Sequence, residues 1–307
     1  MYNGKLTVMA VHAHPDDELI GTGPLLARYA HEGVECVLVT CTRGEAGEIH
    51  DPDLKEEEAR PILGEIRLRE LACALAILGV QHSEQLGYRD SGMVGTAEND
   101  DPRSFHMADM EEAVGRLVAH VRHYQPEVIV TYNEFGGYGH PDHINAHRIA
   151  VAAFDAAADP TLYPQAGAPW QAKKLYYTSW NIEEWQKLTE TLKERGLPSP
   201  WGDDEEPADL SEEDRQKRAD ETQKERERSI AEAARVTTKM DNTAYTNLVF
   251  QAARCHRSQF AQDGVFFTMP EDLQTLAFGH DWFIRARSLV AVAEKPESDL
   301  LVGLAGG

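Results

Sequence analysis

The sequence predicts an α/β fold of the Rossmann-like kind, with a mostly parallel sheet, helices on both faces and a smaller, partly helical C-terminal portion. Residues 6–11 and 34–40 form short, partly β-branched apolar runs, which are typical of strands buried on both faces of a parallel sheet. Between them, residues 19–31 have the pattern of a helix, and Gly33 is placed to end it. A strand, a helix and a second strand at this short spacing indicate a right-handed parallel crossover.

The rest of the chain continues this alternation. We expect residues 1–158 to form the catalytic core and residues 159–307 to complete the sheet and the pocket, with a charged helical insert near 201–229. The further helices are predicted at 53–78, 107–124, 181–196 and 232–260, and the further strands at 86–88, 128–132, 174–180 and 288–293.

The charge balance excludes polyanionic partners. Among 307 residues, 30 basic and 52 acidic side chains give a formal net charge of −22, which opposes binding to nucleic acid or to an anionic membrane. No apolar stretch is long enough to span a bilayer, and no charged-then-apolar leader opens the chain. We therefore expect a cytoplasmic protein, and the sequence leaves open whether it forms homo-oligomers.

Four cysteines are dispersed along the chain, and three of them fall within apolar strand or helix patterns. Buried free thiols in a reducing cytoplasm are favoured over disulfides or a metal site for Cys36, Cys41, Cys73 and Cys255.

A polar cluster directly follows the first predicted strand. His14 and Pro15 are succeeded by three carboxylates, Asp16, Asp17 and Glu18, and acidic residues suit the first turn of a helix. The cluster is therefore expected at the carboxyl edge of the sheet, where open α/β sheets bind their ligands.

A second cluster repeats this arrangement downstream. After the predicted strand 128–132 and a glycine-rich loop that contains Tyr138, the residues His140, Asp142 and His143 open another helix. Either cluster alone could be a strand-to-helix turn with capping carboxylates and a partly exposed histidine. Two such clusters at equivalent junctions favour a metal site.

The donor types in the two clusters are those that zinc accepts. His14, Asp17 and His143 would supply three protein ligands and leave one position open, which is the catalytic arrangement. One Zn²⁺ per chain is expected, and another divalent transition metal would also fit. Asp16 would lie beside the metal, where it could take a proton from a metal-bound water with a pKa of about 7.

At this level of detail the chain resembles a known family. HAHPDDE near the N-terminus and GGYGHPDH downstream are similar to the motifs of the PIG-L/LmbE-like family of zinc-dependent de-N-acetylases, in particular its mycothiol-pathway branch. The similarity extends through TCTRGEAGE, RDSGM and the C-terminal half. The resemblance implies a small-molecule substrate that contains glucosamine, such as N-acetylglucosaminyl-inositol.

The resemblance also suggests substrate-binding residues. Glu48, Arg67 and Asp90 match positions that contact substrate in the family, and His256 lies in a His-x-Ser-Gln element that would line the pocket or support a metal ligand. The structural alternatives are a charged surface turn for Glu48, a snorkelling side chain for Arg67, an Asx-turn for Asp90 and an ordinary histidine for His256.

The remaining polar residues of the second cluster have roles in the expected hydrolysis. Tyr138 and a protonated His140 would stabilise the tetrahedral oxyanion, and Asp16 or His140 would protonate the leaving amine. Asp142 would orient a histidine by a hydrogen bond.

Two alternatives remain open at the level of sequence. Within the same chemistry, a mycothiol S-conjugate amidase is favoured by residues 162–164, 169–170 and 174–177, which look more like that relative. From a different class, a noncatalytic sugar- or nucleotide-binding module would fit a Rossmann-like sheet, but the Gly-x-Gly-x-x-Gly turn expected after the first strand is missing.

Overall fold

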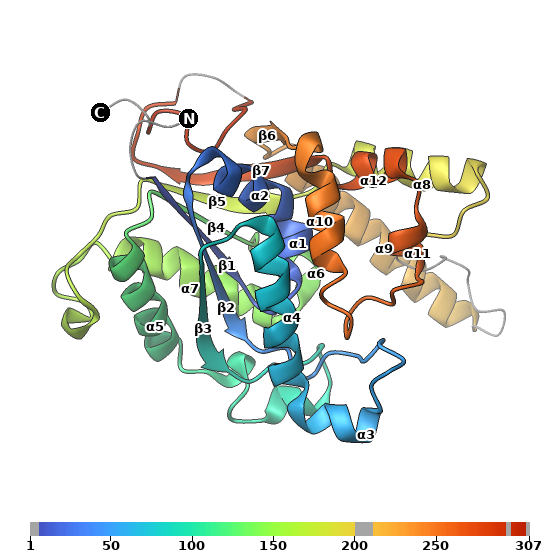
Figure 1. The fold of residues 1–307 in the computed structure, drawn as a ribbon, viewed down its shortest axis with the longest axis horizontal. Helices are drawn as coiled ribbons and strands as arrows, with labels where there is room; N and C mark the ends of the chain where they lie inside the picture. Colours follow the sequence, from blue (N-terminus) through green and yellow to red (C-terminus); the bar gives the residue numbers. More distant parts are fainter. Residues whose placement is uncertain (1–5, 200–210, 293–295, 305–307) are drawn as a thin grey trace.

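A seven-stranded β-sheet forms the centre of the computed structural model, which describes residues 6–199, 211–292 and 296–304 (Figure 1). The strand order is β3-β2-β1-β4-β5-β7-β6. The mixed α/β fold class predicted from the sequence is therefore confirmed. The strands are β1 (Thr7–His12), β2 (Glu35–Thr42), β3 (His82–Tyr88), β4 (Val128–Thr131), β5 (Lys174–Ser179), β6 (Thr238–Asp241) and β7 (His280–Ser288).

Helices cover both faces of this sheet. Val8 packs on the face covered by α2, α4 and α10, whereas Met9 packs on the face covered by α5 and α7, as the alternation of side chains along a strand requires (Figure 1). The helices are α1 (Asp17–Gly21), α2 (Gly23–Glu32), α3 (Glu56–Ala59), α4 (Leu63–Leu78), α5 (Met110–Tyr124), α6 (Gly136–Gly139), α7 (Pro141–Ala156), α8 (Ile182–Glu194), α9 (Glu212–Ala233), α10 (Thr246–Ala253), α11 (Val265–Thr268) and α12 (Glu271–Phe278).

The direction of the strands determines where a ligand can bind. β1 pairs in parallel with both β2 and β4, β3 continues beyond β2, and β5 continues beyond β4. The chain thus leaves β1 to one side and later returns to its other side. The carboxyl ends of β1 and β4 lie together at this reversal of strand order, where open α/β sheets form their binding crevice. β7 is antiparallel to both β5 and β6 at the far edge.

Two predicted helices are interrupted. The helix expected at 19–31 divides at Thr22 into α1 and α2, with Pro24 in the first turn of α2. The helix expected at 53–78 divides into α3, a 3₁₀ turn at Arg60–Ile62 and α4. Pro61 lies in that turn, and its missing N–H and fixed φ disfavour a continuous α-helix.

Two predictions in the C-terminal half are wrong. The helix expected at 232–260 contains strand β6 and the separate helix α10, because the β-branched Thr237 and Thr238 lie beside β7 and Thr238 pairs with Phe283. The strand expected at 288–293 is instead β7, which ends at Ser288. Leu289 beyond it is 58% exposed, so the apolar run does not enter the core.

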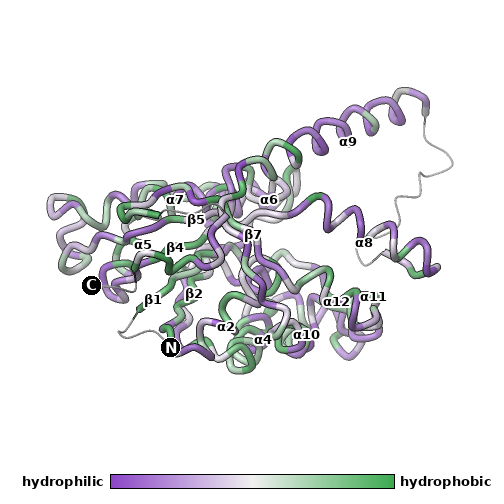
Figure 2. The backbone as a smooth tube through the Cα atoms, turned by 90° about the horizontal axis from the view of Figure 1, so that it is seen from above, coloured by the Kyte–Doolittle hydropathy of each residue, from purple (hydrophilic) through white to green (hydrophobic). Residues whose placement is uncertain are grey.

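The charged insert forms a projecting helix. α9 is polar along nearly all of its length and extends away from the sheet (Figure 2). Its first turn is capped by Ser211, whose Oγ accepts the Asp214 N–H at 3.1 Å. The part of the predicted insert at 201–210 lies outside the described residues. None of the helices that the structure describes is long and apolar enough to cross a membrane.

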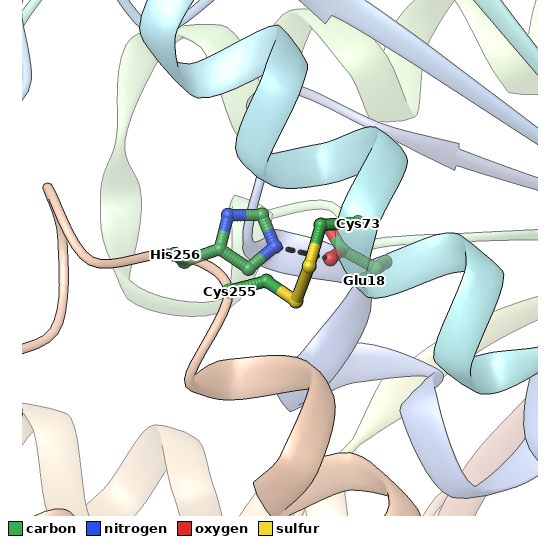
Figure 3. Close-up of a disulfide and its surroundings, with 4 residues drawn as sticks. All are labelled: Glu18, Cys73, Cys255 and His256. Carbon is green, nitrogen blue, oxygen red and sulfur yellow. Dashed lines mark hydrogen bonds and ion pairs between the residues drawn. A yellow bond between two sulfur atoms is a disulfide. The ribbon is translucent and has the colours of Figure 1, made fainter.

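The cysteines divide into two kinds. Cys36 and Cys41 are buried free thiols, as expected. The prediction is wrong for the other two, because a disulfide joins Cys73 in α4 to Cys255 just after α10 (Figure 3). The two residues are 182 positions apart in the sequence, so the pairing depends on the packing of α4 beside α10, which no local pattern reveals.

Candidate metal centre and active site

The two polar clusters meet at the carboxyl edge of β1 and β4. His14 and Asp17 lie at the junction of β1 and α1, whereas His140 and His143 lie at the start of α7. His140 is the N-cap of that helix: its Nδ1 accepts the Asp142 N–H at 3.1 Å. Capping therefore fixes the helix end that presents His143 to the first cluster.

Two contacts among the three predicted ligands have a spacing that suits zinc. His14 Nδ1 lies 3.3 Å from Asp17 Oδ2, and His143 Nε2 lies 3.3 Å from Asp17 Oδ1. Two donors that each lie about 2.0–2.1 Å from a tetrahedral ion are separated by about 3.3 Å. The donor atoms are therefore close to ligand spacing.

The hydrogen bonds of His143 leave one nitrogen available. His143 Nδ1 lies 3.1 Å from the Gly136 carbonyl oxygen, so the neutral ring donates there and Nε2 carries a lone pair. His143 Nε2 is buried and has no hydrogen-bond partner among the described residues. A buried acceptor without a donor is costly, and a metal ion at this point would satisfy it.

Among the described residues, two sets of three donor atoms lie within 4.8 Å of one another, namely His14 with His140 and His143, and His14 with Asp90 and Asp142. The predicted set with Asp17 is not one of them, because its two 3.3 Å contacts involve different oxygens of Asp17. His140 is less suitable because Nδ1 accepts a backbone N–H, which leaves Nε2 as an N–H donor in the neutral ring. Asp90 accepts the N–H groups of Ala46 and Gly92. The set with Asp17 remains the best supported.

Asp142 contacts the other nitrogen of His14. His14 Nε2 lies 3.2 Å from Asp142 Oδ2, and the same carboxylate accepts the N–H of Ser91 at 2.9 Å and also the Ser91 hydroxyl. Asp142 is fully buried. This arrangement, in which a carboxylate receives the N–H of a histidine whose other nitrogen faces the metal position, is common around metal ligands.

Asp16 has an unusual backbone conformation and a partly exposed carboxylate. Its φ and ψ are 104° and −24°, a left-handed conformation that is uncommon for residues with a Cβ and is frequent at functional sites. Asp16 Oδ2 pairs with Arg67 at 3.1 Å. Burial raises the pKa of Asp16 to about 6 although Arg67 opposes this shift, so the group titrates in the range that suits a general base.

Negative charge is in excess around these residues. The four carboxylates of Asp16, Asp17, Asp90 and Asp142 are faced, among the described residues, by a single arginine in ion-pair contact, Arg67. Burial by itself lowers the pKa of His14, but Asp90, Asp142 and Asp17 raise it well above its ordinary value. The cluster therefore stabilises positive charge, which a divalent cation would supply.

Tyr138 and His140 border the same cluster. Tyr138 is 59% exposed, and its ring centroid lies 4.9 Å from that of His143. The hydroxyl of a tyrosine is both a donor and an acceptor, so Tyr138 can donate a hydrogen bond at this edge of the cluster. Burial and the neighbouring histidines lower the pKa of His140 to about 4, and protonation at Nδ1 would break the helix cap. The neutral ring therefore replaces the protonated form expected from the sequence.

Arg67 is neither solvated nor snorkelling. It is 3% exposed, and its guanidinium donates to the carbonyl oxygens of Gly44 and Pro15 while pairing with Asp16. A Cβ at Gly44, which has a φ of 70°, would overlap this guanidinium. Arg67 thus holds together the loops that follow β1 and β2 and contacts Asp16 from the side.

The other predicted substrate contacts divide by exposure. Asp90 is 3% exposed and lies 3.5 Å from His14 Nε2, at the floor of the cluster. The Glu48 side chain is 83% exposed and pairs with His50 on the outer surface. His256 is fully buried against Glu18, so the expectation that it lines the pocket is wrong. Glu48 and His256 are therefore not among the residues gathered around His14.

Two contacting residues were missed by the sequence analysis. Tyr132 donates its hydroxyl to Asp17 Oδ2 at 2.7 Å and accepts the Ala13 N–H at 2.9 Å, so it links the two clusters. The sequence offered one indication of this role, because Tyr132 directly follows the last residue of β4. Ser91 lies within the quoted RDSGM segment, but its contact with Asp142 depends on a separation of 51 residues.

Comparison with known proteins agrees with this geometry. Residues 9–154 match the family described as PIG-L, GlcNAc-PI de-N-acetylase. A protein of Geodermatophilus obscurus named 1D-myo-inositol 2-acetamido-2-deoxy-alpha-D-glucopyranoside deacetylase is 39% identical over 97% of this chain and 98% of its own length. A protein of the same name from Thermobifida fusca is 42% identical over 85% of this chain and 86% of its own length.

Solved structures share the fold at low sequence identity. The N,N'-diacetylchitobiose deacetylase of Pyrococcus horikoshii has a TM-score of 0.60 at 19% identity, over 92% of this chain and 84% of that one. GalB, the 4-carboxy-2-hydroxymuconate hydratase of Pseudomonas putida, has a TM-score of 0.57 at 17% identity, over 94% of this chain and 99% of that one. Because a hydratase shares the fold, the fold alone does not identify the reaction. The near full-length identity to the curated relatives does show the family, and this chain belongs to the PIG-L family of de-N-acetylases.

Proposed function

We propose that this protein is a zinc-dependent de-N-acetylase that hydrolyses the acetamide of N-acetylglucosaminyl-inositol and releases acetate and a free amine. The observation that carries the proposal is the buried Nε2 of His143, which has no hydrogen-bond partner among the described residues and lies 3.3 Å from the carboxylate of Asp17, which also contacts His14. The names of relatives that are 39% identical over 97% of the chain support the choice of substrate.

His14, Asp17 and His143 would hold the ion. The chemistry that bound zinc supplies is Lewis-acid activation of a water and of the amide carbonyl. Tyr132 orients Asp17 through its hydroxyl, and Asp142 orients His14 through Nε2. Both contacts would restrict the ligand side chains to one conformation before substrate arrives.

The protons are moved by residues of the chain. Asp16 takes the proton of the attacking water, because its carboxylate adjoins the ligand Asp17 and its pKa of about 6 is close to neutral pH. The Tyr138 hydroxyl and the Nε2–H of neutral His140 donate to the oxyanion that develops on the carbonyl oxygen. Protonated Asp16 then gives its proton to the leaving amine, as the carbon–nitrogen bond breaks.

Two of the residues that favoured an S-conjugate amidase, Trp170 and Tyr163, contact residues outside the cluster around His14. Trp170 donates its indole N–H to the Pro126 carbonyl at 2.8 Å, and Pro126 precedes β4. The Tyr163 hydroxyl donates to the Glu111 carbonyl at 2.9 Å, on α5. Trp170 thus lies at the amino edge of the sheet, opposite the metal centre. These contacts give no support to the amidase over the deacetylase.

The test is a comparison of two substrates with one enzyme preparation. Zinc-loaded protein is incubated with N-acetylglucosaminyl-inositol and, separately, with a mycothiol S-conjugate, and the free amine is quantified. We expect amine release from the first at a kcat/KM at least tenfold higher than from the second. A preference for the conjugate would select the amidase. Sugar binding without release of amine would select the noncatalytic module.

A further inference from the structure

A buried ion pair lies directly beneath Asp16. The Asp16 N–H donates to Glu18 Oε2 at 2.8 Å, and the other oxygen of the same carboxylate, Oε1, lies 2.8 Å from His256 Nε2 (Figure 3). The side chains of Glu18 and His256 are both 0% exposed. Both side chains are buried, so they can affect the reaction only through neighbouring residues, and the Glu18 carboxylate contacts the backbone of Asp16 directly.

Asp16 needs support at its backbone because of its conformation. A φ of 104° is seldom adopted by a residue with a side chain, and it persists only where the surroundings impose it. Glu18 holds the backbone nitrogen of Asp16, whereas Arg67 holds its carboxylate at 3.1 Å. Two separate contacts, one at the backbone nitrogen and one at the carboxylate, therefore restrain the orientation of the Asp16 side chain.

Both restraints are connected to helix α4. Arg67 lies on α4, and so does Cys73, whose disulfide with Cys255 ties the end of α10 to α4. His256 follows Cys255 directly and carries the ion pair to Glu18 (Figure 3). α4 is therefore connected to Asp16 directly through the Arg67 guanidinium and indirectly through the segment that carries His256. That segment is held to α4 by the disulfide and also by Ser258, which donates to Glu70 of α4 through its N–H at 2.8 Å and its hydroxyl at 2.6 Å.

We propose that Glu18 and His256 are positioning residues for the deacetylation, that they maintain the left-handed backbone of Asp16, and that the disulfide between Cys73 and Cys255 anchors them. This inference rests on the proposed function, in which Asp16 is the general base. It adds the expectation that the state of a distant disulfide affects the base without affecting the metal.

The first experiment separates positioning from folding and from metal binding. Glu18→Ala, Glu18→Gln and His256→Ala are measured for kcat, KM, zinc content and melting temperature. A displacement of about 1 Å can cost about 10²-fold in rate, so Glu18→Ala should lose about 10²-fold in kcat, with KM and zinc content unchanged. Glu18→Gln keeps an acceptor for the Asp16 N–H and should recover most of the kcat.

A second His–Glu contact, whose side chains are 36% and 17% exposed, serves as the control. His82 Nε2 lies 2.9 Å from Glu35 Oε1 at the amino ends of β2 and β3, so His82→Ala breaks a contact of the same type away from the site. We expect unchanged kcat for this variant and a reduced kcat for His256→Ala. Wild-type kcat for Glu18→Ala, or an equal loss for His82→Ala and His256→Ala, would overturn the proposal.

The disulfide is tested by substitution and by reduction. A dithiol reductant transfers two electrons to the disulfide, which yields the thiols of Cys73 and Cys255 and the oxidised reductant. Reduced enzyme and the double variant Cys73→Ser/Cys255→Ser should both show a lower kcat at constant zinc content. If both keep wild-type kcat while Glu18→Ala is impaired, the disulfide is not the anchor.

A readout that does not depend on activity distinguishes this inference from the proposed function. In a crystal structure of Glu18→Ala, Asp16 should leave the left-handed region or lose its contact with Arg67. If the wild-type enzyme releases no amine from any tested amide, the proposed function fails, and the conformation of Asp16 still decides the positioning inference. An unchanged Asp16 in Glu18→Ala would refute it.

Discussion

Two buried clusters of charged residues lie at opposite edges of the sheet, and they satisfy their charges differently. At the amino edge, Glu297 is 2% exposed and accepts hydrogen bonds from Lys174, Tyr176 and Thr238, while Arg285 pairs with it at 2.7 Å. Lys174 also donates to the Leu300 carbonyl at 2.9 Å. The single carboxylate is therefore surrounded by donors that belong to the chain itself.

At the carboxyl edge the balance is reversed. Four carboxylates around His14 are faced by one guanidinium, and His143 Nε2 has no hydrogen-bond partner among the described residues, although Asp17 Oδ1 lies 3.3 Å away. Buried charges that pair with one another are compensated within the chain, whereas a buried cluster with excess negative charge favours a cation that compensates it. The comparison therefore separates a structural cluster around Glu297 from a functional cluster around His14, although both consist of buried charged side chains.

The largest expected effect is the loss of a metal ligand. His143→Ala should lose bound zinc and amide hydrolysis together, because the remaining two ligands do not form a catalytic site. Zinc content and amine release are measured on the same sample, with His123→Ala on the exposed surface of α5 as the control. Full zinc occupancy in His143→Ala would remove this residue from the ligand set.

The second effect distinguishes the base from the ligands. Asp16→Asn preserves shape but removes basicity, so kcat should fall by about 10²–10⁴-fold while zinc stays bound. Asp155→Asn makes the same chemical change on the exposed side of α7 and should leave kcat unchanged. Loss of zinc from Asp16→Asn would make Asp16 a ligand, and a wild-type rate would place the base elsewhere.

The third effect tests the structural cluster. Glu297→Ala leaves Lys174 and Arg285 buried without their carboxylate, and breaking such a pair costs about 3–5 kcal/mol in the free energy of unfolding. We expect urea denaturation to show this loss, while kcat at low urea stays unchanged. The exposed Glu227→Ala on α9 is the control. A loss of zinc or of kcat in folded Glu297→Ala would contradict the separation of the two clusters.

The sequence could predict that His14, Asp17 and His143 lie together because each of them follows the end of a strand. His14 and Asp17 follow one parallel strand and His143 follows another, and the carboxyl ends of neighbouring parallel strands meet at one edge. The topology therefore brings residues more than 120 positions apart into contact without any detailed knowledge of the packing. The same reasoning placed the loop that contains Glu48 correctly at that edge. It could not predict the direction of the Glu48 side chain, because strand order does not determine how a loop side chain is oriented.

Contacts between helices were beyond this reasoning. The ion pair of Glu18 with His256 spans 238 residues, and the disulfide of Cys73 with Cys255 spans 182. Both depend on how α4 and α10 pack over α1, and no periodicity in the sequence specifies that arrangement. Arg67 is a related case: amphipathic spacing could not distinguish a solvated arginine from one buried against the carbonyl groups of Gly44 and Pro15.

Asp281 shows a third way to bury a carboxyl group, and it gives the smallest of the four effects. Asp281 is 8% exposed and accepts the Asn242 side-chain N–H at 2.6 Å, and burial raises its pKa to about 7. The group is thus kept neutral by a proton below that pH, in contrast to Glu297, which pairs with Lys174 and Arg285. Between the unfolded pKa near 3.8 and the folded pKa near 7, the folded state binds one more proton than the unfolded state, so stability falls as the pH rises. From pH 5 to pH 6 the contribution of Asp281 should decrease the free energy of unfolding by about 1.4 kcal/mol.

Asp281→Asn keeps the hydrogen bond without a titrating proton. It should therefore remove this decrease in the free energy of unfolding, measured by urea denaturation at the two pH values. An identical pH dependence in wild type and Asp281→Asn would show that Asp281 is ionised in the folded protein, and that its charge is paired in the manner of Glu297.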